Sequence, residues 1–169
     1  ADAFVVKFDP GGNFVWATYC GGTAWDLSNS ICTDIPGNVM ITGRTGSNNF
    51  PVSPGAFQST LNGGGDSFVV KFDPGGNNLW STYYGGNSFD ELGGIDTDPL
   101  NNIVITGWSN STTIPMTAGG FQSSYNGGGA DGIVVKFNST GTPLWASFYG
   151  GSNVDAFGGI SIEASGNIV

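Results

Sequence analysis

Histidine is absent from the 169-residue sequence, and no Walker-type GxxxxGK[ST] loop occurs. The absence of histidine excludes Ser-His-Asp and Cys-His arrangements, histidine-ligated metal sites and an imidazole general base. The glycine-rich GGG stretches precede predicted strands, so they lack the helix N-terminus that a phosphate-binding loop uses. The composition therefore predicts a protein that is not an enzyme.

Basic residues are also scarce. Four Lys and Arg stand against thirteen Asp and Glu, which gives a formal net charge of −9. Nucleic acids and anionic membrane surfaces are bound by clusters of Lys and Arg, and the sequence has none. No apolar run approaches the length of a membrane span, and no signal peptide stands at the N-terminus. We therefore expect neither a nucleic-acid partner nor membrane insertion.

What the chain does contain is glycine and apolar residues. Thirty residues are glycine, 38% are hydrophobic, 13% are aromatic and only 10% are charged. Glycine does not follow the three-residue spacing of collagen, and runs of helix-favouring residues are missing. This composition favours an all-β fold with many glycine-containing turns.

The sequence repeats itself. The string DSFVVKFDPGGNNLWSTYYGG at 66–86 returns in close form at 2–22 and at 131–151. The period is 64 residues for the first step and 65 for the second, and 34 of 64 positions are identical between 2–65 and 66–129. We therefore interpret residues 1–169 as one array, with repeats at about 2–65, 66–130 and 131–169, the third being partial.

Each repeat contains four strand candidates bounded by turn residues. In the second repeat they are FVVKF at 68–72, NLWSTYY at 78–84, GGIDTD at 93–98 and IVITGW at 103–108, followed by a long polar loop at 109–129. Four short antiparallel strands per unit of 40 or more residues are typical of a β-propeller blade. A β-solenoid is the alternative, although its coils are usually shorter and more regular.

The strands carry apolar side chains on both faces, as FVVKF shows. This is expected of a sheet that is covered on both sides, as blades stacked around an axis are. Trp16, Trp80 and Trp145 recur at one strand position, and we expect them to pack between blades.

Several motifs together resemble the bacterial β-propeller repeat called SBBP. They are W-x-(S/T)-x-(Y/F)-(Y/C)-G-G, then D, then I-x-T-D-x-x-x-N-x-x-I-T-G, then P-x-x-x-G-x-F-Q and D-x-F-V-V-K-F, and they cover essentially the whole chain. The third copy departs from them at 138–141, where NSTG replaces DPGG, and at 161–163, where SIE replaces the x-T-D pattern. The resemblance implies a large secreted or cell-surface protein with many copies, in which no catalytic residue is assigned to the repeat.

The carboxylates follow the repeat as well. Eleven of the thirteen fall in four equivalent sets, which are Asp2/Asp66/Asp131, Asp9/Asp73, Asp26/Asp90/Asp155 and Asp34/Asp98/Glu163. A residue that occurs once per blade is better explained as fixing a turn or capping the backbone than as performing chemistry at one site. Glu91 and Asp96 stand outside these sets, and a hydrolase would have to use them.

The turns at 9–13, 34–38, 73–77 and 98–102 offer carboxylate, amide and carbonyl oxygens, which are the ligands that Ca²⁺ takes. The same residues are what tight β-turns prefer, and each turn holds one carboxylate where calcium sites gather several. The turn interpretation is favoured, so we expect no cofactor and keep calcium as the alternative.

Cys20 and Cys32 occur in the first repeat only. They form either a disulfide within that repeat or two buried free thiols that behave as small apolar residues, and we favour the second interpretation.

These observations lead to the hypothesis of a non-catalytic, extracellular structural or adhesive module of a bacterial surface protein. Its expected partners are further copies of itself or neighbouring repeats of a longer chain. The alternative is a carbohydrate-binding propeller for surface glycans, in which Trp25 and Trp108 offer ligand-facing aromatic rings.

We also predict an assembly edge. The strand containing Phe4, Val6 and Phe8 is expected to pair with a strand equivalent to the one containing Ile168 and Val169, because IVITGW and GIVVKF are neighbours of this kind across the long loop. Such a head-to-tail contact closes into a ring or continues as a filament.

Overall fold

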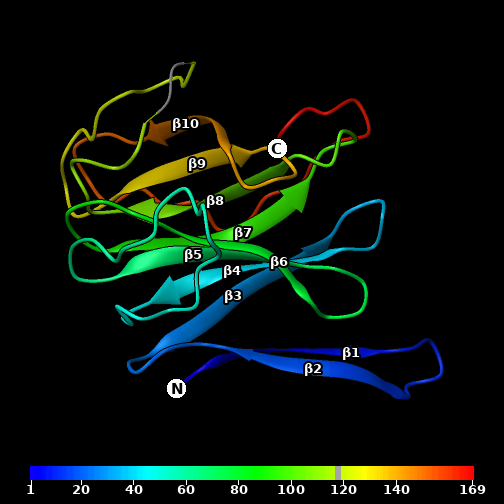
Figure 1. The fold of residues 1–169 in the computed structure, drawn as a ribbon. Coiled ribbons are helices and arrows are strands. Elements are labelled where there is room, and N and C mark those ends of the chain that lie inside the picture. The colour runs from blue at the N-terminus through cyan, green and yellow to red at the C-terminus, as the bar shows by residue number, and fades with distance from the viewer. Residues whose placement is uncertain (117–118) are drawn as a thin grey trace.

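The computed structural model describes residues 1–116 and 119–169, and these residues form ten strands and no helix (Figure 1). No helix that could cross a membrane is therefore present in these two ranges. The strands are β1 (Ala3–Phe8), β2 (Phe14–Cys20), β3 (Asp26–Thr33), β4 (Val39–Thr45), β5 (Asp66–Phe72), β6 (Asn78–Tyr84), β7 (Asp90–Thr97), β8 (Ile103–Ser109), β9 (Asp131–Phe137) and β10 (Pro143–Tyr149).

The strands form three sheets that follow one another in chain order (Figure 1). The hairpin β1–β2 is the first sheet, β3-β4-β5-β6 is the second and β7-β8-β9-β10 is the third. All seven ladders are antiparallel. Four-stranded antiparallel sheets stacked in this way are β-propeller blades, so the propeller prediction is confirmed over the β-solenoid alternative.

The turns explain why each hairpin forms where it does. Asp9 Oδ1 accepts hydrogen bonds from the backbone N–H groups of Gly11 and Asn13, and the N–H of Gly12 donates to the Asp9 carbonyl. The same pattern recurs at 73–77. The fourth turn residue has positive φ, which glycine adopts at no steric cost.

The sheets begin and end at different points from the sequence repeats. A repeat read from FVVKF starts at β5, whereas the second sheet starts at β3 and ends at β6. The five-residue connection 85–89 passes from one sheet to the next, and the long loop 46–65 joins neighbouring strands of the same sheet. The FVVKF strand is therefore the third strand of its blade, and the hairpin β1–β2 is the second half of a blade.

The core lies between the sheets. Every residue of β5 is buried, as expected for a strand that is covered on both faces. One cluster of buried residues joins β1 and β2 to one face of the second sheet through Val5, Phe68 and Val70. A second cluster joins the other face, at Val69, to Ile133 and other residues of the third sheet. The buried side chains of each sheet thus pack against the neighbouring sheets.

Cys20 and Cys32 are free thiols, so the disulfide alternative is wrong. They lie in different sheets, Cys20 at the end of β2 and Cys32 in β3. Burial raises the pKa of Cys20 to about 11 and that of Cys32 to about 12.

Candidate functional site

The junctions between adjacent blades are stabilised by side-chain contacts that recur from blade to blade. The indole N–H of Trp16 in β2 donates to the carbonyl of Pro74, in the β5–β6 turn of the following blade, at 3.0 Å. The indole N–H of Trp80 in β6 donates to the carbonyl of Ser139, in the equivalent β9–β10 turn, at 3.1 Å. The tryptophan of one blade therefore binds the turn of the next, which confirms its predicted packing role.

Each of these tryptophans also packs on the next sheet. Trp16 lies 6.0 Å from the ring of Phe72 and Trp80 lies 6.4 Å from the ring of Phe137, measured between ring centroids. The indole of Trp16 leaves no room for a side chain at Gly76 in this turn, because a Cβ there would lie only 2.8 Å from the ring. The equivalent distance from Gly141 to the Trp80 ring is 2.9 Å. The glycine of the turn is thus required by the positive φ and by the tryptophan above it.

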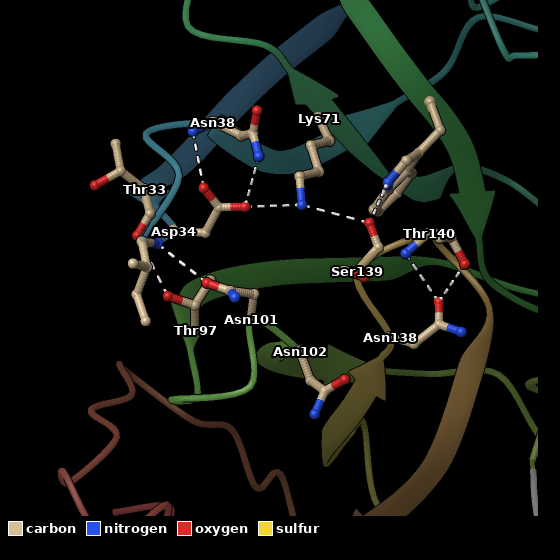
Figure 2. Close-up of polar contacts among 12 residues, drawn as sticks. Thr33, Asp34, Asn38, Lys71, Thr97, Asn101, Asn102, Asn138, Ser139 and Thr140 are labelled. Atoms are coloured by element: carbon tan, nitrogen blue, oxygen red, sulfur yellow. Dashed lines mark hydrogen bonds and ion pairs between the residues drawn. The ribbon is translucent and has the colours of Figure 1, made fainter.

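A buried ion pair, Lys71–Asp34, stands beside Trp80 (Figure 2). Lys71 Nζ lies 2.9 Å from Asp34 Oδ2 and 3.4 Å from the carbonyl of Ser139, so it ties its own sheet to the next one. Burial alone would raise the pKa of Asp34, but the hydrogen bonds from Asn38 and Lys71 outweigh it and the pKa lies below its usual value. The Asp34 carboxylate is therefore ionised at neutral pH.

The third sheet repeats this arrangement. Lys136 Nζ lies 2.7 Å from Asp98 Oδ2, and Asn102 donates to the same carboxylate. Lys7 in β1 occupies the equivalent position and donates to the Pro74 carbonyl at 2.9 Å. Among the described residues it has no carboxylate partner.

A groove of about 610 Å³ opens between the second and third sheets, next to the Lys71–Asp34 ion pair. Its walls combine apolar side chains with amides and hydroxyls, and they include Phe57, Leu79, Trp80, Asn101 and Thr140, together with Lys71. Phe57 is 42% exposed and stacks on Tyr84 at 6.2 Å. No sequence pattern predicted this groove, because its wall includes a loop, 53–57, that has no periodic pattern.

The same long loop protects the outer edge of the blade. The N–H of Tyr83 in β6 donates to the carbonyl of Gln58, and the N–H of Ser53 donates to the carbonyl of Ser81. In the third sheet the N–H of Phe148 donates to Gln122 in the same way. Without such cover an outer strand presents unpaired backbone groups that attract another strand.

Buried aspartates fix the connections between blades. Asp90 accepts hydrogen bonds from Gly86 N–H, Ser109 and Ser111, and Asp26 has the equivalent partners in the preceding blade. Asp66 is fully buried as well, and its Oδ1 has no hydrogen-bond partner among the described residues. Burial, together with the charge of Asp90, raises the pKa of Asp66 to about 7.

The predicted assembly residues lie on the open faces of the stack. Phe4 is 62% exposed and Phe8 is 59% exposed, whereas the equivalent Phe68 and Phe72 of the second sheet are buried against the first. Val6 lies on the same face and is also exposed. This face of β1 is therefore equivalent to one that a preceding blade covers.

The other end of the stack is also apolar. A hollow of about 400 Å³ on the outer face of the third sheet is lined by Trp145, Tyr149, Phe157, Ile168 and Val169, among others. Ile168 pairs with Ile162 through an isolated antiparallel bridge. This bridge is equivalent to the pairing of Val39 with Thr33 at the start of the second sheet.

The two predicted ligand-facing tryptophans are half-buried. The guanidinium of Arg44 lies 5.4 Å from the centroid of the Trp25 ring and covers one of its faces. Trp108 stands at the Arg44 position of the next blade, opposite Glu91 and Gly132 in the ladders. The structure does not bring the two tryptophans into one site, and a role for them in ligand binding stays a prediction.

Glu91 and Asp96 lie on the same strand, β7, but do not form a catalytic pair. Glu91 binds Arg44 at 3.0 Å and accepts a hydrogen bond from Asn29, and Asp96 accepts hydrogen bonds from the N–H groups of Thr97 and Ile162. Their cross-strand partners are four residues apart, so the Cα atoms of Glu91 and Asp96 lie about 14 Å apart along the strand. Each carboxylate is held by its own separate partners, so the two do not form the close pair, ~5–9.5 Å apart, that glycosidases use.

The turn carboxylates considered for calcium accept hydrogen bonds from their own turns. Both oxygens of Asp9 and of Asp73 bind the side-chain amide or backbone N–H groups of the same turn. Among the described residues no group of three or more acidic, histidine or cysteine side chains could hold a metal ion. The absence of a bound cofactor stays a prediction.

Comparison with known proteins agrees with the blade architecture. No family model matches the chain. It is 28% identical, over 167 aligned residues, to an uncharacterized WD repeat-containing protein, L264, of Acanthamoeba polyphaga mimivirus. The match covers 88% of this chain and 12% of that protein, so the chain spans a small part of this relative's length. The sheets and this similarity together support a propeller-type repeat fold.

Proposed function

We propose that this chain is a non-catalytic structural or adhesive repeat module of the SBBP kind, working on the surface of a bacterial cell. Its blades associate with further blades, from the same polypeptide or from other copies, into a ring or filament. The observation that carries the proposal is the repeated junction, in which a tryptophan, a lysine and a turn carbonyl join each blade to the next. Hydrogen bonds from a tryptophan and from a lysine to the turn carbonyl recur at equivalent positions of successive blades, which suits a protein built for assembly.

Two further observations support this proposal. The non-repeated carboxylates Glu91 and Asp96 are engaged in separate contacts, so neither is available as a general acid or base beside the other. The similarity to a WD repeat-containing protein fits a role in binding other proteins, for which propellers offer rigid surfaces.

The surface location is tested by labelling intact cells of the source organism with an antibody raised against the chain. We expect labelling before lysis, with a cytoplasmic protein labelled only afterwards as the control. Labelling that requires lysis would contradict a surface role.

The groove at the blade junction favours a second candidate function, carbohydrate binding. Sugars present apolar faces and hydroxyl groups, and this groove combines the exposed ring of Phe57 with the amide of Asn101 and the hydroxyl of Thr140. Aromatic stacking with polar groups at the rim is the usual chemistry of such sites.

A glycan array separates this candidate from the first. We expect sugar binding to be lost in Phe57→Ala and retained in Phe121→Ala. Phe121 is the equivalent residue of the following blade, whose outer face is not covered by another sheet. If sugar binding is lost in Trp25→Ala and Trp108→Ala instead, the sugar binds at those tryptophans. An array without signal would rule out carbohydrate binding.

A further inference from the structure

We propose that the side-chain amide of Asn138, in the β9–β10 turn, is an attachment site for an N-linked glycan. Asn138-Ser139-Thr140 matches the Asn-x-Ser/Thr acceptor sequence, in which x is any residue except proline. The site takes its sugar from an activated donor of the glycosyl diphosphate class. This inference goes beyond the proposed function, because it does not depend on what the blades bind.

The oxygen of the Asn138 amide holds the turn. In the equivalent β5–β6 turn, Asp73 Oδ1 accepts hydrogen bonds from the backbone N–H groups of the second and fourth residues after it. Asn138 Oδ1 accepts the same two hydrogen bonds, from the N–H groups of Thr140 at 3.0 Å and Thr142 at 2.9 Å. The amide oxygen therefore takes over the role of the aspartate, and it fixes the plane of the amide group.

The nitrogen of the amide is left free. Asp73 Oδ2, the equivalent atom, accepts a hydrogen bond from the side-chain amide of Asn77. Thr142 stands at the Asn77 position in this turn and has no amide to offer. Among the described residues Asn138 Nδ2 donates no hydrogen bond, and Figure 2 shows it pointing away from Thr140. The turn thus presents a nitrogen that is accessible for reaction.

The threonine of the acceptor sequence lies beside the amide. Thr140 Oγ1 donates to Asn138 Oδ1 at 2.8 Å, and Ser139 and Thr140 are both exposed (Figure 2). The residues equivalent to Thr140 in the other two turns are Gly11 and Gly75, which have no hydroxyl. The acceptor sequence is therefore present in this turn and absent from the other two.

The reaction that the site supports is a transfer of one glycosyl group. Asn138 Nδ2 forms a bond to C1 of the sugar, and the bond from C1 to the diphosphate oxygen breaks. The diphosphate leaves with the bonding electron pair and takes up the proton that Nδ2 loses. The step needs no oxidant or reductant, and a glycosyltransferase of the cell supplies the donor.

A glycan at this position is compatible with the stacking of the blades. The second sheet has neighbours on both faces, and yet Pro74 and Gly75 of its equivalent turn are exposed. The junction uses the backbone carbonyl of Ser139, which accepts from Trp80, whereas the glycan uses the side chain of Asn138. The modification therefore leaves the contacts between blades in place.

A second acceptor sequence in the chain, Asn110-Ser111-Thr112, provides an internal contrast. Ser111 is fully buried and donates to Asp90, and the N–H of Thr112 donates to Asn87. The Oδ1 atom of Asn110 is buried, without a hydrogen-bond partner among the described residues. An enzyme cannot reach this sequence in the folded chain, so the fold selects the turn at 138–140.

Peptide mass spectrometry of the protein purified from its source organism tests the proposal. Trypsin cleaves after Lys71 and Lys136, so that Asn110 lies in the peptide 72–136 and Asn138 lies in the peptide that begins at Phe137. We expect the second peptide to carry a glycan on Asn138 and the first to be unmodified. A peptide with Asn138 free of sugar would overturn the proposal, and equal occupancy of both peptides would overturn the selection by the fold.

Ser139→Pro is the sharpest variant, because the chain already contains its result twice. Pro10 and Pro74 stand at this position in the other turns, and among the described residues the Ser139 N–H donates no hydrogen bond that proline would remove. We expect the variant to keep the melting temperature of the parent chain and to lose the glycan completely. Glycosylation that persists in Ser139→Pro would contradict the proposed acceptor sequence.

Changes at the threonine provide the matched controls. Thr140→Ala should abolish the modification and Thr140→Ser should retain it, since the acceptor sequence needs a hydroxyl at this position. Thr112→Ala makes the same change in the buried sequence and should leave the glycan unchanged. A chain that labels intact cells but carries no sugar on Asn138 would refute this inference alone, whereas a glycosylated chain that labels only after lysis would refute the surface role alone.

Discussion

Asp66 shows how a single buried residue sets a property of the whole chain. Its carboxyl group accepts hydrogen bonds from the Asn62 N–H and from Gln58, but one oxygen has no partner among the described residues, and Asp90 lies nearby. Its pKa of about 7 in the folded protein exceeds its ordinary value of 3.8. The folded state therefore holds a proton that the unfolded state releases between these two values.

We predict that this proton makes the protein more stable in mild acid. The stabilisation is fully present below about pH 4 and is lost as pH rises through 7, because the folded-state pKa is raised. The urea midpoint should be higher at pH 5 than at pH 8, and Asp66→Asn should flatten the difference. Asp9→Asn is the control, since the pKa of Asp9 is lowered by its hydrogen bonds to Asn13 and its titration lies below this range. An unchanged pH dependence in Asp66→Asn would contradict the assignment.

The Lys71–Asp34 pair is a second residue-scale feature with a measurable consequence. Removing one member of a buried pair leaves the other charge uncompensated, which costs about 3–5 kcal/mol. Lys71→Met should therefore lower the free energy of unfolding by about 3 kcal/mol or more, and Asp34→Asn added to it should recover part of the loss. Denaturant unfolding of the two single variants and the double variant measures this coupling. Additive losses would show that the pair contributes nothing.

At the scale of elements, each blade depends on the turn of the next one. Gly76→Ala should destabilise the chain more than Gly55→Ala, although both residues have positive φ, because only Gly76 lies under a tryptophan. The difference should be about 1–3 kcal/mol, the usual result of overpacking. Thermal unfolding of the two variants checks it, and Trp16→Ala combined with Gly76→Ala should remove most of the difference.

The sequence predicted the individual strands, but it did not show which strands belong to the same sheet. The periodic strings predicted the strands, because alternating turn and apolar residues mark each hairpin, and the recurrence of Trp16 and Trp80 predicted their packing. A repeat reveals its period but not where a sheet begins. The short connection 85–89 resembles a hairpin, yet it crosses between sheets, and the long loop 46–65 joins strands of one sheet. Lys71 and Asp34 are 37 positions apart, so nothing local in the sequence showed that they meet.

At the scale of the whole molecule, calcium removal should have little effect. The turn carboxylates already bind the N–H groups of their own turns, so the turns have hydrogen bonds that do not depend on a metal. EDTA should leave the melting temperature nearly unchanged. A drop of many degrees that calcium restores would show that a site stabilises the folded state by ligand linkage.

Stability should also vary across the stack, and the repeat provides three copies of one strand in which to measure it. β5 pairs with strands on both edges and is covered on both faces, whereas β1 pairs with β2 only and exposes Phe4 and Phe8. Because amide protons exchange through local opening, and opening is easiest where few contacts hold a strand, residues 3–8 should exchange faster than residues 67–72 and 132–137 in dilute protein. Hydrogen exchange with mass spectrometry measures all three peptides in one sample. As the concentration is raised, residues 3–8, 14–20 and 155–169, which lie on the open faces of the stack, should gain protection from a second copy, while the internal strands stay constant. Equal exchange in the three strands at every concentration would mean that the first hairpin is held as firmly as the central blade.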